Sequence, residues 1–392
     1  MQSQNSDKSK NNFLIFGSPQ INDIEIDEVI DSLKSGWLGT GPKVKKFEEK
    51  FNKYTEVKHA VAVNSCTAAL HLSLLTLEIT AGDEVITTPM TFCSTINSII
   101  HVGAIPVLVD IDPISMNIDP KKIEEKITSR TKCILPVHFA GRPCNMNKIM
   151  NIADKHNLFV IEDCAHAIET TYNGKHAGTF GNFGCFSFYV TKNLTTGEGG
   201  MVISNHEKKA NRIKRLALHG LSKDAWKRFS DEGYQHYYVE EAGFKYNMMD
   251  IQAAIGIHQL ERIEENWYRR KEIWDYYNNN LSELPIELPA PLEKNTRHAY
   301  HLYTVLVEEK KSGLTRDDFL RKMNDKNIGT GVHYLSIPEH PFYNKQFGWK
   351  PNNFPNAMKI GRQTVSLPLS AKLSDNDVER IVKTIKIILE RK

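Results

Sequence analysis

The feature that most constrains the fold is an alternation of short apolar runs with amphipathic stretches between about residues 59 and 205. The apolar runs cover residues 59–64, 84–90, 105–111, 132–139 and 158–163. They are rich in Val and Ile and show little polar alternation, which is typical of strands buried on both faces. Helix candidates at 66–77 and 120–129 lie between them. The alternation predicts an α/β fold with a mainly parallel sheet and helices on both faces.

The second half of the chain has a different pattern. Residues 248–281 lack Pro and predict one long helix, or two in tandem, that leaves the large domain. Prolines then mark a linker, followed by an expected strand (301–309), helix (315–326), strand (329–335) and terminal helix (373–392). We therefore expect a flexible N-terminal tail (1–12), a large domain (13–265) and a smaller C-terminal α+β domain (266–392).

Composition narrows the functional class. The net charge of +3 from 50 basic and 47 acidic residues gives no reason to expect a nucleic-acid partner. No apolar run approaches the ~20 residues that cross a bilayer, and the polar first dozen residues do not resemble a secretory signal. Six cysteines without a CxxC pair indicate a reduced cytoplasmic protein rather than a disulfide framework. We expect no membrane partner and no metal site.

Ligands of such sheets bind beyond the carboxyl ends of the strands, so candidate site residues are expected at these ends. The run 59–64 is followed by Ser65, Cys66 and Thr67 at the start of a predicted helix. These residues cap free N–H groups, and the same N–H groups can bind a phosphate. No GxGxxG or Walker lysine is present, which excludes the usual dinucleotide and NTP fingerprints.

The run 158–163 ends on Glu162 and Asp163, whose side chains point to opposite faces of a strand. A buried carboxylate needs a partner, and a protonated pyridine nitrogen is one that would make the ring an electron sink. His166, three residues later, could lie against such a cofactor. The alternative is that Asp163 caps the next helix and His166 is a core histidine.

The segment 184–204 is the most informative. A hydrophobic strand runs into Thr191 and Lys192, followed by the turn TTGEGG and another apolar strand. Burial favours the neutral amine of a lysine, which is the nucleophile that forms a Schiff base with an aldehyde. Ser187 is close enough in sequence to reach a phosphate. The alternative for Lys192 alone is a strand-end lysine that points to water. A phosphate cradle, a carboxylate and a lysine together favour a pyridoxal 5′-phosphate (PLP) site.

These segments resemble the DegT/StrS-type nucleotide-sugar aminotransferases, a branch of the fold-type I PLP enzymes. The resemblance rests on NSCTAAL, IEDCAHAIET and FSFYVTKNLTTGEGGMV, and extends to SGWLGTGPKVKKFEEKF and GFKYNMMDIQAAIG. It implies a large domain with a seven-stranded, mainly parallel sheet and a smaller C-terminal domain.

The resemblance also implies roles at the cofactor. Lys192 would form the Schiff base and move the proton between Cα and C4′, Asp163 would pair with the pyridine nitrogen, and His166 would contact the ring near its hydroxyl. Phe92 would stack on the ring. Three residues would hold the phosphate: Cys66, Thr67 and Ser187. Many members have Gly where this chain has Cys66, but the backbone N–H that binds the phosphate is kept.

Further positions implied by the resemblance concern the substrate and the partner subunit. Asn247 matches an asparagine that reaches into the neighbouring subunit's site, which implies a homodimer with shared active sites. Gly39 and Thr40, together with His333 and Tyr334, match loops that line the sugar-nucleotide pocket.

The resemblance implies transfer of the amine of L-glutamate to a nucleotide-linked keto sugar. TTGEGG and GFKYN are similar to members that aminate C4 of a UDP- or dTDP-linked 4-keto sugar. Alternatives on the same machinery are a C3-keto sugar, an inosose or a keto sugar acid. A non-catalytic PLP-fold regulator is the alternative from another class. The near-neutral charge, the lack of a helix-turn-helix segment and the intact Lys192 argue against it. Family dehydratases carry histidine in place of the lysine, so transamination is favoured.

Overall fold

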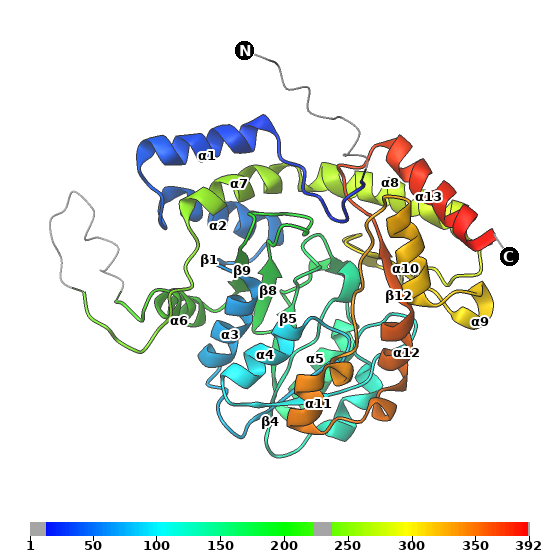
Figure 1. The fold of residues 1–392 in the computed structure, drawn as a ribbon. Helices are drawn as coiled ribbons and strands as arrows, with labels where there is room; N and C mark the ends of the chain where they lie inside the picture. The colour runs from blue at the N-terminus through cyan, green and yellow to red at the C-terminus, as the bar shows by residue number, and fades with distance from the viewer. Residues whose placement is uncertain (1–12, 223–236, 391–392) are drawn as a thin grey trace, which may run out of the picture.

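A seven-stranded sheet forms the centre of the computed structural model, which describes residues 13–222 and 237–390 (Figure 1). The predicted tail, 1–12, lies outside the described residues. The strand order is β1-β9-β8-β5-β4-β2-β3. The strands are β1 (His59–Val63), β2 (Glu84–Thr87), β3 (Ile105–Leu108), β4 (Thr131–Ile134), β5 (Phe159–Asp163), β8 (Phe183–Ser187) and β9 (Gly200–Ser204). Only β9 runs antiparallel to its two neighbours, so the predicted seven-stranded, mainly parallel sheet is confirmed.

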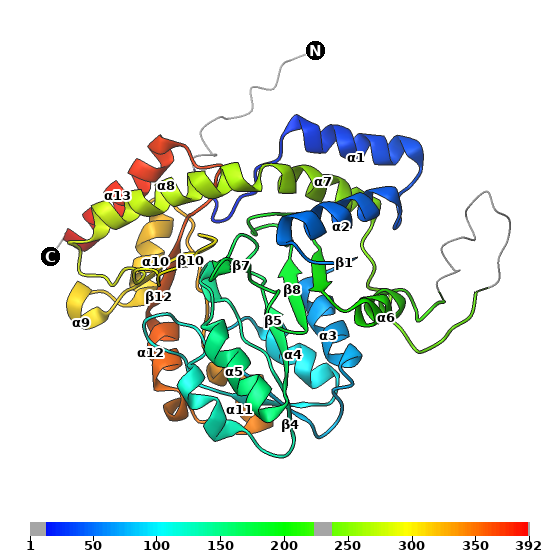
Figure 2. The same cartoon turned by 180° about the vertical axis from the view of Figure 1, so that it is seen from behind.

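Helices cover both faces of this sheet. Successive strand residues point in opposite directions, so a continuous apolar run places apolar side chains on both faces, and both must be buried. Val61 and Val63 of β1 pack with α3 (Cys66–Thr76) and α6 (Glu207–Ala217). Ala60 and Ala62 pack on the other face, with α2 (Pro42–Thr55) and α7 (Asp250–Glu261). Further along that face, α5 (Met146–His156) packs on β4 and β5 (Figure 2). The near-continuous apolar runs of the sequence therefore supply two cores at once.

One predicted helix is wrong. Residues 120–129 form two short 3-10 helices, Pro120–Lys122 and Glu124–Lys126, instead of an α-helix. The segment buries Ile123 fully but little else. A segment that buries one side chain gains too little from packing to offset the cost of helix nucleation, so its backbone closes in tight i→i+3 turns.

The long helical segment is two helices in tandem, α7 and α8 (Ile263–Leu281), one of the two predicted arrangements. It leads to a second core, in which Trp274 and Tyr277 pack with residues of α10 (Arg316–Asp325) and α13 (Asp375–Glu390). Leu14 also packs in this core. Figure 1 shows α8, α10 and α13 together at this end of the molecule. The domain boundary at residues 265/266 remains a prediction.

The predicted strand at 329–335 is also wrong. The strand β11 (Tyr303–Leu306) pairs instead with β12 (Thr364–Leu367), which lies in a stretch expected to be a loop. Gly329 donates its N–H to Leu14, and Gly331 forms one isolated bridge to Ser366. Because these backbone partners come from two distant segments, no continuous ladder forms, and the Tyr334 hydroxyl lies 2.9 Å from His166 Nε2.

The remaining elements connect or edge these cores. A small sheet has the order β10-β6-β7. The bounds are β6 (Thr171–Tyr172), β7 (Lys175–His176), β10 (Thr296–Arg297), α1 (Asp23–Ser35), α4 (Cys93–His101), α9 (Glu309–Ser312), α11 (Pro341–Phe347) and α12 (Pro355–Gln363). Across residues 13–222 and 237–390, none of the helices combines the length and the apolar character that a membrane span requires.

Candidate active site

A cavity of about 480 Å³ lies beyond the carboxyl ends of β1, β5 and β8. Its volume falls within the range of about 300–1,000 Å³ that is usual for small-molecule sites. Nine of the predicted site residues line it: Cys66, Thr67, Phe92, Asp163, His166, Ser187, Lys192, His333 and Tyr334. The topology therefore brings together side chains that are up to 268 positions apart (66 to 334) in the sequence.

Lys192 lies in the turn between β8 and β9, where its backbone N–H donates to the Tyr189 carbonyl at 2.8 Å. Burial lowers the pKa of its amine to about 8, although the nearby Cys66 and Asp163 act in the opposite direction. At pH 7, about one such amine in ten is neutral, against about one in three thousand at the ordinary pKa. Lys192 is thus suited to act as a nucleophile and as a proton carrier.

Asp163 ends β5 and is almost fully buried. Its carboxylate accepts hydrogen bonds from Thr95 Oγ1 at 2.8 Å and from the Ala165 N–H at 3.1 Å. Burial raises the pKa of this carboxyl, against the effect of these hydrogen bonds. Residues 164–170 form turns, so Asp163 does not cap a helix. A buried carboxylate bonded to neutral donors at the wall of a cavity suits a cationic ring nitrogen.

His166 is held in one tautomer. Its Nδ1 accepts the Ala140 N–H at 3.2 Å, and its Nε2 lies 2.9 Å from the Tyr334 hydroxyl. Burial lowers the pKa of His166 well below its usual value, so the ring is neutral and its one proton lies on Nε2. Tyr334 also lies 5.9 Å, between ring centroids, from Phe92. Phe92 itself is 56% exposed and is available to stack on a flat ligand.

The start of α3 forms a cradle of backbone N–H groups. Ser65 is the N-cap residue and accepts the Ala68 N–H at 3.1 Å, which leaves the first-turn N–H groups of Cys66 and Thr67 without helical partners. Gly200 lets β9 pass close to this turn, because a Cβ there would lie 2.7 Å from Cys66 N. Gly200 pairs with Ser187, so the Ser187 hydroxyl is brought to the same cradle. Ser65 therefore caps the helix, and the free N–H groups beside it are suited to bind a phosphate, which stays a prediction.

Three predicted residues do not line this cavity. Asn247 donates from Nδ2 to Thr40 Oγ1 at 2.7 Å, and the Gly39 carbonyl accepts the Asp250 N–H at 2.8 Å. The backbone of Asn247 bridges to Val63 at the end of β1. Asn247, Thr40 and Gly39 thus form a second cluster beside the cavity within one chain.

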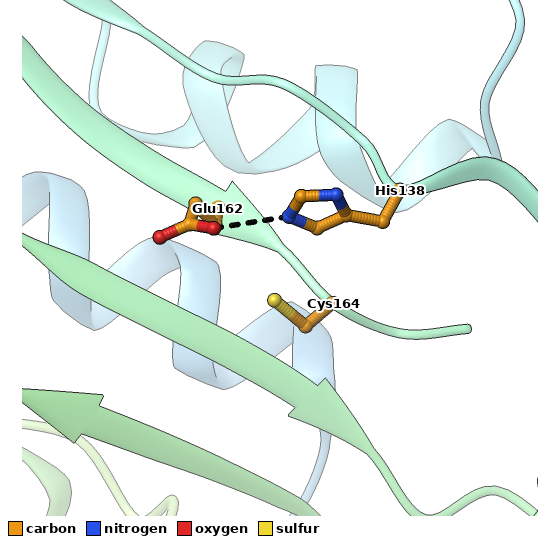
Figure 3. Close-up of side chains that lie close together, drawn as sticks. All are labelled: His138, Glu162 and Cys164. Carbon is orange, nitrogen blue, oxygen red and sulfur yellow. Dashed lines mark hydrogen bonds and ion pairs between the residues drawn. The ribbon is translucent and has the colours of Figure 1, made fainter. Parts of the chain in front are cut away.

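Glu162 points to the face opposite Asp163, as strand alternation predicts. His138, Glu162 and Cys164 lie together, with ligand-type atoms within 4.8 Å of one another (Figure 3). His138 Nε2 contacts Glu162 Oε2 at 3.0 Å, and the backbone N–H groups of residues 178, 180 and 181 also donate to this carboxylate. Each carboxylate oxygen thus accepts two hydrogen bonds, and the cluster fixes a loop to β5 rather than offering free metal ligands.

Thr95 was missed in the sequence. It lies on α4, three residues after Phe92, and its hydroxyl also contacts Thr91 Oγ1 at 2.7 Å. Thr91 precedes α4 and Thr95 lies in its first turn, so two hydroxyl residues on either side of the helix start could have indicated a shared polar partner.

Comparison with known proteins agrees with this geometry. The model of the DegT/DnrJ/EryC1/StrS aminotransferase family matches residues 19–386. The chain is 48% identical over 384 residues to the spore coat polysaccharide biosynthesis protein SpsC of Bacillus subtilis, covering 98% of this chain and 99% of SpsC.

Two solved structures are also similar. Spr1654 of Streptococcus pneumoniae, in its PLP form, superposes with a TM-score of 0.90 at 33% identity and covers 97% of this chain and 99% of its own. PseC of Helicobacter pylori, an aminotransferase involved in pseudoaminic acid biosynthesis, has a TM-score of 0.89 at 28% identity, with 97% and 100% covered. The chain therefore belongs to the DegT/DnrJ/EryC1/StrS aminotransferase family and is a PLP-dependent transaminase.

Proposed function

We propose that the cavity around Lys192 moves the amine of L-glutamate onto a nucleotide-linked keto sugar, at C4 of a UDP- or dTDP-linked 4-keto sugar. The observation that carries the proposal is the pair formed by Lys192 and Asp163 in one cavity. Burial favours the neutral amine of Lys192, and the buried Asp163 carboxylate offers a charge for a cationic ring.

In this proposal the chain's own residues hold and orient the cofactor. The N–H groups of Cys66 and Thr67 and the hydroxyl of Ser187 bind its phosphate, Asp163 pairs with its ring nitrogen, and Phe92 covers its ring. When bound, PLP supplies the electron sink that stabilises negative charge at the substrate carbon.

Proton transfer falls to Lys192. Its pKa of about 8 lies near the operating pH, where an amine can both accept and donate a proton at the substrate carbon. His166, neutral and bonded to Tyr334, presents a fixed edge to the cavity and keeps the wall around Lys192 in one arrangement.

The sugar substrate is supported by the relatives. SpsC is named for spore coat polysaccharide biosynthesis and PseC for pseudoaminic acid biosynthesis. We assign His333 and Tyr334 to the substrate side of the cavity, where the tyrosine hydroxyl and imidazole offer polar contacts to sugar hydroxyl groups.

We further propose that the protein is a homodimer with shared sites. The helix α1 exposes an apolar face, with Ile26, Ile30 and Leu33 each at least 39% exposed. The chain then leads through Trp37 to the Thr40–Asn247 cluster. Asn247 Oδ1 is buried without a hydrogen-bond partner among the described residues, which suits a group that the partner's site completes.

Two half-reactions test the assignment. Purified protein loaded with PLP is mixed with L-glutamate, and the visible absorbance band should convert to the near-ultraviolet band of the aminated cofactor. UDP- and dTDP-4-keto sugars are then added, with a 3-keto nucleotide sugar, an inosose and a free keto sugar acid as comparisons. Return of the visible band and an amino-sugar mass with a 4-keto substrate support the proposal. Turnover with one of the comparison substrates alone refutes the assignment to C4.

A further inference from the structure

We infer that a buried clamp on Asn193 positions the catalytic lysine. The clamp consists of Glu169, Arg270, Asn193 and His301. The inference rests on the proposed role of Lys192, because Asn193 is its immediate neighbour in the chain.

Asn193 uses its whole amide group. Its Nδ2 donates to Glu169 Oε2 and to the Ala299 carbonyl, both at 2.9 Å. Its Oδ1 lies 2.9 Å from His301 Nδ1 and accepts the proton of that ring nitrogen. An amide bonded on three sides has one orientation, so the backbone of the turn that carries Lys192 is fixed at the next residue.

Glu169 and Arg270 anchor this amide. They form a directly bonded ion pair, and both side chains are at most 3% exposed. A buried ion pair contributes little net stability, because desolvation of both charges offsets their attraction. Its orientation is nevertheless well defined, and Glu169 has one oxygen on Arg270 and the other on Asn193. Such a pair suits a positioning role better than a stabilising one.

The clamp joins the two parts of the chain at the cavity. Glu169 lies in the successive turns after β5 that also contain His166, Arg270 lies on α8, and His301 lies two residues before β11. The His301 ring lies 4.5 Å, between centroids, from the ring of His166. Lys192, Asn193 and Arg270 also border one small cavity of about 30 Å³. A shift of α8 or of the segment before β11 would therefore reach Lys192 through Asn193.

The test removes the clamp while leaving Lys192 in place. In Asn193→Ala, loaded with PLP, we expect the rate of the half-reaction with saturating L-glutamate to fall about 10- to 100-fold, since a misplacement of about 1 Å can cost about 100-fold. The visible circular dichroism of the bound cofactor should lose most of its intensity, because it reports a fixed orientation of the lysine-linked ring. The L-glutamate concentration at half-maximal rate should stay unchanged.

Two further variants keep the test decisive. The double variant Glu169→Leu with Arg270→Met replaces the ion pair by apolar side chains, which preserves folding more often than removal of one charge. It should show the same two losses. Asn278→Ala is the matched control. Asn278 lies on the same helix as Arg270 and accepts a hydrogen bond from the Tyr303 hydroxyl, away from the clamp. Its removal should leave the rate and the dichroism unchanged.

Unchanged dichroism in both clamp variants overturns the inference, whether or not the melting temperature falls, because that result indicates a structural role alone. This outcome differs from failure of the proposed function. If Lys192→Ala keeps the visible band of lysine-bound cofactor, the role of Lys192 itself is refuted.

Discussion

Replacing Asp163 by Asn should slow the half-reaction with L-glutamate by about 1,000-fold while the cofactor stays bound. The carboxylate is buried and accepts hydrogen bonds from two neutral donors, so its charge is available for the ring nitrogen. Two unit charges about 4 Å apart attract by about 4 kcal/mol at an effective dielectric constant of about 20. Loss of that attraction from the transition state corresponds to about three powers of ten in rate.

The site should tolerate this substitution. Asn has the shape of Asp, and its Oδ1 can still accept the Ala165 N–H. The hydroxyl of Thr95 can turn to accept from the new amide and donate to Thr91, since either threonine can be the donor in their contact. Cofactor content after gel filtration should therefore match the wild type.

Stability should change in the opposite direction from activity. Burial raises the pKa of Asp163, so folding of the cofactor-free protein is favoured most below the unfolded pKa of about 3.9. This contribution is lost as the pH rises through the folded pKa. Asn carries no charge, so cofactor-free Asp163→Asn should melt at the wild-type temperature or above it at pH 7 and lack this part of the pH dependence.

Rapid mixing with L-glutamate under single-turnover conditions measures the rate, and thermal melts of cofactor-free protein between pH 4 and 8 measure stability. Thr95→Val is the control that keeps the charge but removes one hydrogen bond to it, which is worth about 1.5–3 kcal/mol, or about 10- to 100-fold. An Asp163→Asn rate within about tenfold of wild type would contradict the electrostatic argument and leave Asp163 a structural residue.

Three other substitutions test separate parts of the structure. Lys192→Ala should abolish turnover and the visible band with the melting temperature of the cofactor-free protein kept; retained turnover would refute the mechanism. Asn247→Ala should speed loss of PLP on dilution, measured by fluorescence, and equal retention would argue against a shared site. Glu162→Leu leaves His138 and three buried backbone N–H groups without their acceptor, so urea denaturation should show that the free energy of unfolding falls by about 3–5 kcal/mol, as for a broken buried pair. A decrease of less than about 1 kcal/mol would show that the loop relaxes.

The sheet could be predicted because each of its strands is specified locally. The five apolar runs became β1 to β5, since a strand buried on both faces needs an unbroken apolar run. The two errors occurred where tertiary contacts decide. Residues 120–129 have helical composition but bury one side chain, and residues 329–335 have strand composition but find their backbone partners at residues 14 and 366.

The residues of the candidate site also fall into those that a local pattern predicts and those that only tertiary contacts reveal. Asp163, Ser187 and Lys192 could be found because each follows or ends a strand, and parallel strands bring their carboxyl ends to one edge. The clamp could not be found this way, because its members are far apart in the sequence. Asn193 lies 24 positions from Glu169 and 108 positions from His301. Glu169 lies 101 positions from Arg270. No local pattern marks Arg270 in the middle of a helix as the partner of a turn after β5. The residues that carry the chemistry can therefore be predicted from the ends of strands, whereas the residues that hold them in place can be identified only once the packing of the whole chain is known.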